Sequence, residues 1–303
     1  MNTDFEITSE NPFLNFRVRH LLLVGFLISL ATSLVLGLLA SLSGLDPNDP
    51  ILAPIIYTLT FILLCLWARQ RLRRLKISFK RLIGHLPNNY PWLPTLEIVI
   101  AILLFSLGSG HLFYYTVSFF APTLVESLLK QKTFLSDAET FAPLLHNLLT
   151  VIVVTMVAPV VEELIFRGII LHRWAAKWGV TPGVLISALL FAILHANIIG
   201  LFVFGVMMAL LYIKTRTLIV PIVCHALNNL IAVGLELASL NSGTIETMTL
   251  LEQLRSYWWV GVIYIVLSAP WLITFIYKNW TKQSLGVPYF MNSSPSSSST
   301  QHP

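Results

Sequence analysis

The sequence is poor in charged residues. Aspartate, glutamate, lysine and arginine make up 11% of the 303 residues, whereas hydrophobic residues make up 56%. A soluble globular protein carries about 25% charged residues, so this composition excludes a soluble domain and predicts a chain that lies in lipid. The net charge of +5 is concentrated in short loops, as the positive-inside rule produces. We therefore expect membrane lipids as partners and no nucleic acid.

Cysteine is equally scarce. The chain has two, Cys65 and Cys224, and both fall within apolar runs, which excludes a disulfide framework. The sequence also lacks a His-Glu-x-x-His zinc signature. Any chemistry in this chain must therefore rest on the few polar groups that interrupt its apolar segments.

Long apolar runs fill most of the sequence. A spanning helix needs roughly 20 apolar residues, and the runs predict an all-α membrane bundle of about eight transmembrane helices with an intramembrane polar site. The predicted spans cover approximately residues 20–42, 51–67, 93–119, 144–171, 180–195, 198–213, 218–237 and 258–277. The fifth and sixth are short and closely joined, so we expect that hairpin to stop before the far side.

The loop charges predict the topology and the organisation of the chain. The loop after the second span is strongly basic, and such loops lie in the cytoplasm, so both termini are expected there. We divide the chain into a polar cytoplasmic N-terminus (1–19), three transmembrane helices with the basic loop (20–143), a core that holds the polar motifs (144–237), an external loop with the last transmembrane helix (238–280), and a disordered Ser/Pro-rich tail (281–303).

Two adjacent carboxylates and an arginine stand out in the fourth span. Between Leu148 and Leu171 the only ionisable side chains are those of Glu162, Glu163 and Arg167, although a charge at bilayer depth costs roughly 2.5–3.5 kcal/mol on insertion scales. Glu163 and Arg167 are four residues apart, so they share a helix face and can pair. Glu162 is rotated away from both, faces the bundle interior, and suits the role of a general base that activates water.

Three more polar residues recur at the same depth in later spans. A rise of about 1.5 Å per residue places His195, His225 and Asn229 in one slab of the hydrocarbon core with Glu162. His225 and Asn229 share a helix face and suit the stabilisation of an oxyanion. The residues also leave open a metal site, in which a zinc ion is held by Glu162, His195 and His225.

The motifs that contain these polar residues resemble those of the CAAX protease and bacteriocin-processing family of intramembrane endopeptidases, also called the Abi family. That family is marked by Glu-Glu-x-x-x-Arg, Phe-x-x-x-His and His-x-x-x-Asn or Asp in this order. The matching residues in this chain are Glu162, Glu163, Arg167, Phe191, His195, His225 and Asn229. The resemblance covers about residues 144–237, under a third of the chain, and implies a core of about eight spans with the site inside the bilayer.

The resemblance also implies roles for the motif residues. Glu162 and His195 would activate the hydrolytic water, while His225 and Asn229 would stabilise the oxyanion. Glu163 and Arg167 would support them, so the catalytic set comprises all six residues. Both a metalloprotease and a metal-free glutamate mechanism have been argued for the family. The sequence favours neither a bound zinc ion nor a site without a cofactor.

The leading hypothesis is a CAAX prenyl protease-like endopeptidase of a bacterial plasma membrane. It would hydrolyse a peptide, or a lipidated peptide, near the cytoplasmic leaflet. Two alternatives stay open: a non-catalytic scaffold or bacteriocin-immunity protein with the same fold, and a small transporter, since buried ionisable groups are usual there too. Among other polar residues, we expect Asn197, Asn228 and Tyr212 to be hydrogen bonders between helices, and His172 with Arg173 to mark the membrane edge.

Overall fold

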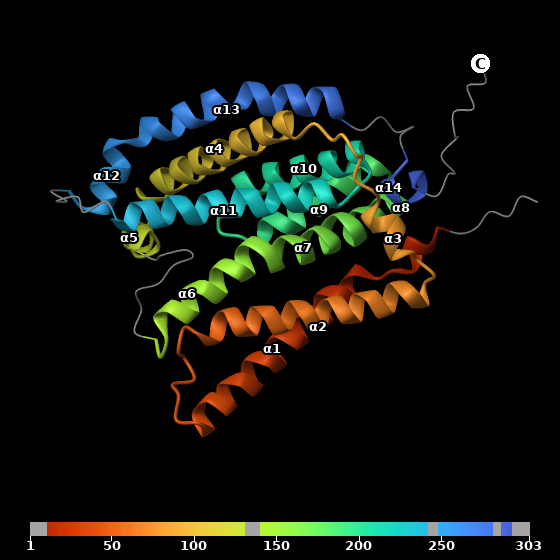
Figure 1. Ribbon diagram of the computed structural model, residues 1–303. Coiled ribbons are helices and arrows are strands. Elements are labelled where there is room, and N and C mark those ends of the chain that lie inside the picture. Colours follow the sequence, from red (N-terminus) through yellow and green to blue (C-terminus); the bar gives the residue numbers. More distant parts are fainter. Residues whose placement is uncertain (1–10, 131–139, 242–247, 281–285, 293–303) are drawn as a thin grey trace, which may run out of the picture.

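The computed structural model describes residues 11–130, 140–241, 248–280 and 286–292. Within these ranges every regular element is a helix, and the long helices lie side by side (Figure 1). The elements are η1 (Pro12–Asn15), α1 (Val18–Leu42), α2 (Leu52–Arg74), α3 (Phe79–Ile83), α4 (Trp92–Val117), α5 (Pro122–Lys130), α6 (Pro143–Ile152), η2 (Val153–Val157), α7 (Ala158–Glu163), η3 (Leu164–Leu171), α8 (His172–Trp178), α9 (Val180–Ile193), α10 (Ile198–Thr215), α11 (Ile219–Asn241), α12 (Leu250–Ser256), α13 (Trp258–Asn279) and α14 (Pro288–Met291). The predicted all-helical membrane fold is confirmed.

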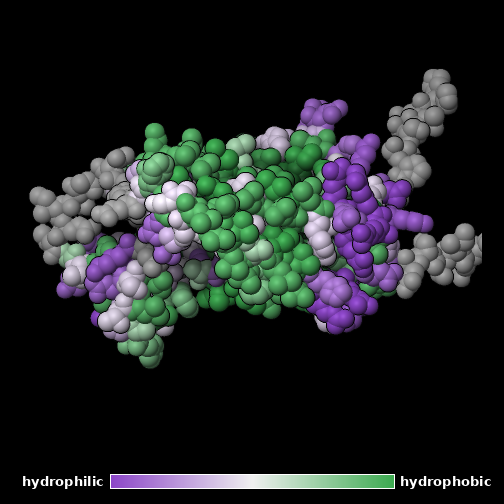
Figure 2. Space-filling view, turned by 90° about the horizontal axis from the view of Figure 1, so that it is seen from below, coloured by the Kyte–Doolittle hydropathy of each residue, from purple (hydrophilic) through white to green (hydrophobic). Residues whose placement is uncertain are grey.

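Seven helical segments of the described residues are long and apolar enough to cross a membrane. The eighth predicted span is α9, which has 14 residues and a length of about 21 Å. That length is short of a hydrocarbon core of about 30 Å, so the expected count of about eight becomes seven spans and one short apolar helix. A space-filling view shows the apolar belt between two polar ends (Figure 2).

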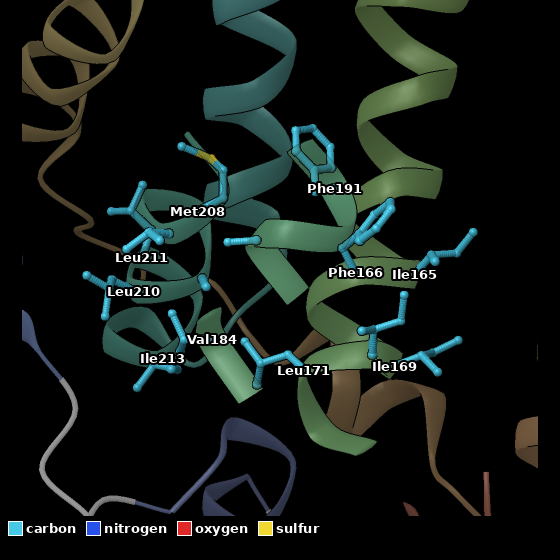
Figure 3. Close-up of a cluster of buried hydrophobic side chains, with 14 of the residues drawn as sticks. Ile165, Phe166, Ile169, Leu171, Val184, Phe191, Met208, Leu210, Leu211 and Ile213 are labelled. Carbon is cyan, nitrogen blue, oxygen red and sulfur yellow. The ribbon is translucent and has the colours of Figure 1, made fainter. Parts of the chain in front are cut away.

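The interior is centred on η3, α9 and α10. Phe166, Val184, Phe191 and Met208 are buried there with other aliphatic side chains (Figure 3). The third span, α4, packs against α10, α11 and α13. The motif-bearing helices are therefore enclosed by the rest of the chain.

The fourth span is one long helix, Pro143–Trp178, and it is not regular. The π-helical segments η2 and η3 lie on either side of α7, so Glu162 and Glu163 lie directly between two changes of helical pitch. Pro159 stands in the first turn of α7 and has no main-chain N–H to donate. Single-turn π segments are frequent at functional sites.

The described segments nearest the two termini, η1 and α14, pack against α8 at the end of this long helix. The His172 ring is fully buried; it stacks on Phe13 at 4.8 Å, and its Nε2 accepts from the N–H of Tyr289 at 3.2 Å. His172 is therefore an interior residue, and Arg173 next to it reaches the N-terminal segment, where its Nε donates to the Phe16 carbonyl at 2.8 Å.

The expected disorder of the tail is wrong for residues 286–292. Within them α14 forms a short helix with Pro288 and Tyr289 buried, and the Tyr289 hydroxyl accepts from the N–H of Ser78 at 3.1 Å. The rest of the predicted tail, 281–285 and 293–303, lies outside the described residues, as do residues 1–10 of the predicted polar N-terminus.

Candidate functional site

A cavity of about 870 Å³ lies within the bundle. Four of the predicted site residues line it: Glu162, His195, His225 and Asn229. They come from α7, the loop after α9, and α11, so three separate segments bring their polar groups to one cavity. The other two predicted residues, Glu163 and Arg167, do not line the cavity and lie behind its wall with no exposed side-chain surface.

Glu163 is the centre of the buried part of the site. Its Oε1 accepts from Nη1 of Arg167 at 3.0 Å, which confirms the predicted pair, and from Nδ1 of His225 at 2.9 Å. Arg167 also donates from Nη2 to the Gly205 carbonyl at 3.3 Å, and its guanidinium lies 4.8 Å from the centre of the Phe191 ring. Buried charges are tolerated when they are paired and hydrogen-bonded. This network meets that condition at Oε1 of Glu163, while Oε2 has no partner within the described residues.

Glu162 has a different environment from its neighbour. Its side chain is 17% exposed, and its Oε2 lies 3.8 Å from Nε2 of His225. The His225 ring thus lies between the two carboxylates, with Nδ1 on Glu163 and Nε2 towards Glu162. Because the hydrogen bond that Nδ1 donates to Glu163 fixes the ring, the orientation of the second nitrogen is fixed as well.

His195 lies in the loop that joins α9 to α10. Its Nδ1 is 2.7 Å from the Phe191 carbonyl, and a carbonyl only accepts, so Nδ1 carries the proton and Nε2 is left as an acceptor in the neutral ring. The ring packs on Phe191, with 4.4 Å between ring centres. Phe191 therefore orients His195 through its main chain and its side chain together.

Asn229 contacts the first π segment. Its Nδ2 donates to the Val154 carbonyl at 2.9 Å. An amide nitrogen has two hydrogens, so one donor remains beyond this bond. Asn228 lies beside it, with its Nδ2 3.5 Å from Asn229 Oδ1, and also lines the cavity.

Side chains from other elements bind carbonyls of both π segments. Val154 accepts from Asn229, Phe166 accepts from Ser187 Oγ at 2.8 Å, and Arg167 accepts from His172 Nδ1 at 3.0 Å. A π turn departs from the regular helical hydrogen-bond ladder, and these bonds hold it in place. Neither π segment nor the bond from Ser187 was predicted from the sequence; Pro159 inside a helical run was the one available signal.

The predicted helix-to-helix hydrogen bonders behave as expected in two cases. Asn197 donates to the Ser106 carbonyl at 2.7 Å and caps α10 through the N–H of Gly200. The buried Tyr212 hydroxyl donates to the Leu82 carbonyl at 2.8 Å. These side chains connect elements, and Tyr212 lies away from the cavity lining.

The residues do not fit the metal site that the sequence left open. Among the described residues, no three His, Cys, Asp or Glu side chains form a group that could hold a metal ion. Nδ1 of each histidine is held, by Glu163 for His225 and by the Phe191 carbonyl for His195, and the two remaining Nε2 atoms do not lie together with a third ligand. No step is therefore derived through zinc.

The cavity extends in an unexpected direction. Arg173, Lys177 and Arg216 mark the basic end of the molecule, where Asn292 donates to the carbonyls of Arg81 and Arg216. The cavity runs the other way, because its lining continues from Glu162 to α5 and α12, which lie at the opposite end (Figure 1). The described lining therefore lies on the side of Glu162 that faces away from the basic end.

Comparison with known proteins agrees with the motifs. The family model described as "Type II CAAX prenyl endopeptidase Rce1-like" matches residues 144–231. The resemblance to that family, read from the three motifs, is thereby confirmed for this part of the chain. The matched residues include all six predicted site residues.

Two curated bacterial proteins are similar to parts of the chain. "Putative membrane peptidase YdiL" of Bacillus subtilis (strain 168) is 36% identical over 92 residues, which are 29% of this chain and 38% of that protein. "Uncharacterized 24.3 kDa protein" of Escherichia coli is 26% identical over 152 residues, which are 47% of this chain and 63% of that protein. The chain thus spans between about a third and two thirds of these relatives. No solved structure matches it.

Proposed function

We propose that this multi-pass membrane protein, similar over residues 144–231 to the type II CAAX prenyl endopeptidases, is an intramembrane endopeptidase. One observation carries the proposal: Glu162, His195, His225 and Asn229, from three separate segments, line one cavity inside an apolar bundle. A carboxylate and two imidazoles are a sufficient set for activating water and moving its proton.

Glu162 is the proposed general base. It is the cavity-facing member of the glutamate pair, and its side chain is partly exposed while that of Glu163 has no exposed surface. Glu162 removes a proton from a water as the water oxygen attacks the carbonyl carbon of the scissile bond. The same proton then passes to the amide nitrogen as the C–N bond breaks, so the reaction leaves one new carboxylate and one new amine.

His195 is proposed to orient that water. With Nδ1 bonded to the Phe191 carbonyl, Nε2 remains to accept a hydrogen bond from the water. Two acceptors, a carboxylate and an imidazole, would then fix the direction of the attacking lone pair, and correct orientation of reactants lowers the barrier.

His225 and Asn229 are proposed to stabilise the oxyanion of the tetrahedral intermediate. His225 donates from Nε2 when this nitrogen carries a proton. Asn229 donates the second hydrogen of its amide nitrogen, the one that does not bond to the Val154 carbonyl. Donors that are already held in place are effective here, because they need little reorganisation as charge develops. Glu163 and Arg167 are positioning residues, since they act through the His225 ring.

The test compares membrane peptides in cells that produce the wild type or Glu162→Gln. The proposal expects peptides that are shortened with the wild type and full length with the variant. Glu97→Gln is the matched control, because Glu97 is an exposed glutamate of α4 outside the cavity lining. Identical peptide sets for the wild type and Glu162→Gln would contradict the proposal.

A second candidate is a non-catalytic scaffold. It is favoured by the hydrogen bonds of Glu163, which connect η3 and α11 through Arg167 and His225, because such bonds stabilise a bundle without any reaction. This candidate expects Glu162→Gln to keep full binding of a membrane partner and to leave all peptides unchanged.

The proposed setting is a bacterial plasma membrane, since the relatives are bacterial. The basic end of the bundle is proposed to lie in the cytoplasm with both termini, as the positive-inside rule requires. The substrate class is a membrane peptide or a lipidated peptide.

A further inference from the structure

The two ends of the bundle differ in charge. Most of the described basic residues gather at the end formed by η1, the end of α2, α3, α8 and the end of α10: Arg17, Arg19, Arg69, Arg71, Arg73, Arg74, Lys76, Lys80, Arg81, Arg173, Lys177, Lys214 and Arg216. The opposite end carries four acidic residues and two basic ones among its described residues: Asp46, Asp49, Glu126, Glu252, Lys130 and Arg255. Polar surface is accordingly densest at the basic end (Figure 2).

The path from the basic end to the site is filled by apolar side chains. Ile169, Leu171, Val184 and Leu210 have no exposed surface, and they pack together below Phe166 and Phe191 in the close-up (Figure 3). A close-packed interior of this kind leaves no room for water or a peptide. Glu162 is therefore closed off from the basic end.

The path from the opposite end is open. The α9–α10 hairpin is short on this side, and the cavity beyond it is lined by Tyr57 of α2, His111 of α4, and His146 and Thr150 of α6. Leu254 of α12 lines its outermost part. The catalytic groups thus form the inner end of a cavity whose remaining length leads away from the basic face.

Polar atoms in this outer half have no partner within the described residues. They are Nε2 of His111, Nδ1 of His146, Oγ1 of Thr150 and Oδ1 of Asn228, and all four residues line the cavity. His146 is 7% exposed. These atoms have almost no accessible surface, and a buried polar group without a hydrogen bond costs about 1–3 kcal/mol. Rotation of these side chains towards a ligand in the cavity that supplies donors and acceptors is therefore favoured.

We infer that the outer half of the cavity binds the main chain of an extended peptide that enters from the membrane face opposite the basic face. The inference rests on the proposed function for the fate of that peptide. The unpartnered atoms suit a peptide main chain, which presents donors and acceptors in a row, and Tyr57 and His111 offer ring surfaces to its side chains. By the positive-inside rule the substrate then lies on the non-cytoplasmic side.

Cysteine labelling tests the direction of entry without any need for activity. In a Cys65→Ala, Cys224→Ala background, Thr150→Cys is exposed to a charged, membrane-impermeant maleimide in intact cells and in inverted vesicles. Lys80→Cys at the basic end and Ser43→Cys in the opposite loop are the sidedness controls. The inference expects Thr150→Cys to be labelled with Ser43→Cys in intact cells, and to be protected in inverted vesicles, where Lys80→Cys reacts.

Two results would overturn the inference: labelling of Thr150→Cys together with Lys80→Cys, or no labelling of it from either side. Tyr57→Cys, on another helix of the same wall, repeats the measurement should Thr150→Cys fail to accumulate. The labelling pattern does not depend on cleavage, so failure here is distinct from unchanged peptides in the Glu162→Gln comparison. If cleavage is found, Thr150→Trp should raise KM more than it lowers kcat, because it fills the path and leaves the catalytic groups in place.

Discussion

Two adjacent glutamates show how one helix serves two regions of the molecule. Glu163 faces the packed wall, where its carboxylate is fully buried and shared by Arg167 and His225. Glu162 faces the cavity, where its side chain is partly exposed and its Oε2 lies 3.8 Å from Nε2 of His225. A buried carboxylate that is paired with an arginine holds its surroundings in place, whereas one that faces a cavity can act on a ligand. The comparison separates a stabilising region from a reactive one, and each change below tests that separation.

The largest expected effect is on the cavity side. Glu162→Gln should lower kcat by about 10²–10⁴-fold, the contribution of a positioned general base, while the thermal midpoint in detergent stays near that of the wild type. Cleavage of a peptide identified by the proteomic comparison measures the rate, and Glu97→Gln is the control. A variant that loses stability as well as rate would show that the two regions are not separate.

Arg167→Met should have the opposite signature. It leaves the buried Glu163 carboxylate without its cation, and removing one partner of a buried pair costs about 3–5 kcal/mol. We expect a large fall in the thermal midpoint and a loss of folded protein. Glu163→Gln combined with Arg167→Met should recover much of that stability, because the double variant carries no unpaired charge; a double variant as unstable as the single one would argue against this pairing.

Gly205 tests how closely α9 and α10 must approach behind the wall. A Cβ at this position would lie 2.9 Å from Cα and Cβ of Ala188, and the Gly205 carbonyl accepts from Arg167. Gly205→Ala should destabilise the protein by about 1–3 kcal/mol through overpacking. Gly234→Ala is the control, since that glycine of α11 has open space around it, and equal midpoints for the two variants would contradict the close contact.

Ser187→Ala removes the side chain that binds the second π segment. The Phe166 carbonyl would lose its bond from Ser187 Oγ, which should cost about 0.5–1.5 kcal/mol. Ser33→Ala is the control, because Ser33 is exposed and its hydroxyl bonds within its own helix. If both variants have the same thermal midpoint, Ser187 does not hold the π segment in place.

The smallest effect lies outside the membrane, at Asp49. Its carboxylate accepts from the Thr140 hydroxyl and from the N–H groups of Phe141 and Ile51, and these bonds, chiefly that of Thr140, lower its pKa below 3.8. A lowered pKa in the folded state adds stability above the unfolded value, and that stability is lost as the pH falls through the folded value. The difference in thermal midpoint between wild type and Asp49→Asn should therefore shrink as the pH is lowered from 5 to 3.

Asp46→Asn provides the control for that titration. Among the described residues, the carboxylate of Asp46 bonds only to Asn48 of its own loop, accepting from the Asn48 N–H at 2.8 Å and from its side-chain amide. The difference in thermal midpoint between the wild type and Asp46→Asn should change less with pH than the difference for Asp49→Asn. An equal change would mean that the bonds from Thr140 and Phe141 to Asp49 add no stability.

Sequence spacing correctly predicted the parts of the site that lie within one helix. Glu163 and Arg167, four residues apart, do pair, and His225 and Asn229 both reach the cavity. It did not predict that His225 also binds Glu163, or that Ser187 binds Phe166, because contacts between segments far apart in sequence depend on how helices pack. The two π segments were missed for the same reason, since tertiary hydrogen bonds hold their carbonyls.

The sequence by itself determined that this chain is helical, lies in a membrane and carries two glutamates, two histidines and an asparagine at similar depth, since hydropathy and helical spacing are local properties. Only the tertiary structure decided that Glu163 also binds His225, how the His225 ring is turned and at which end the cavity continues. Those features are set by packing: the apolar side chains of η3, α9 and α10 fill the space towards the basic end, and the short α9–α10 hairpin leaves the space beyond it unfilled.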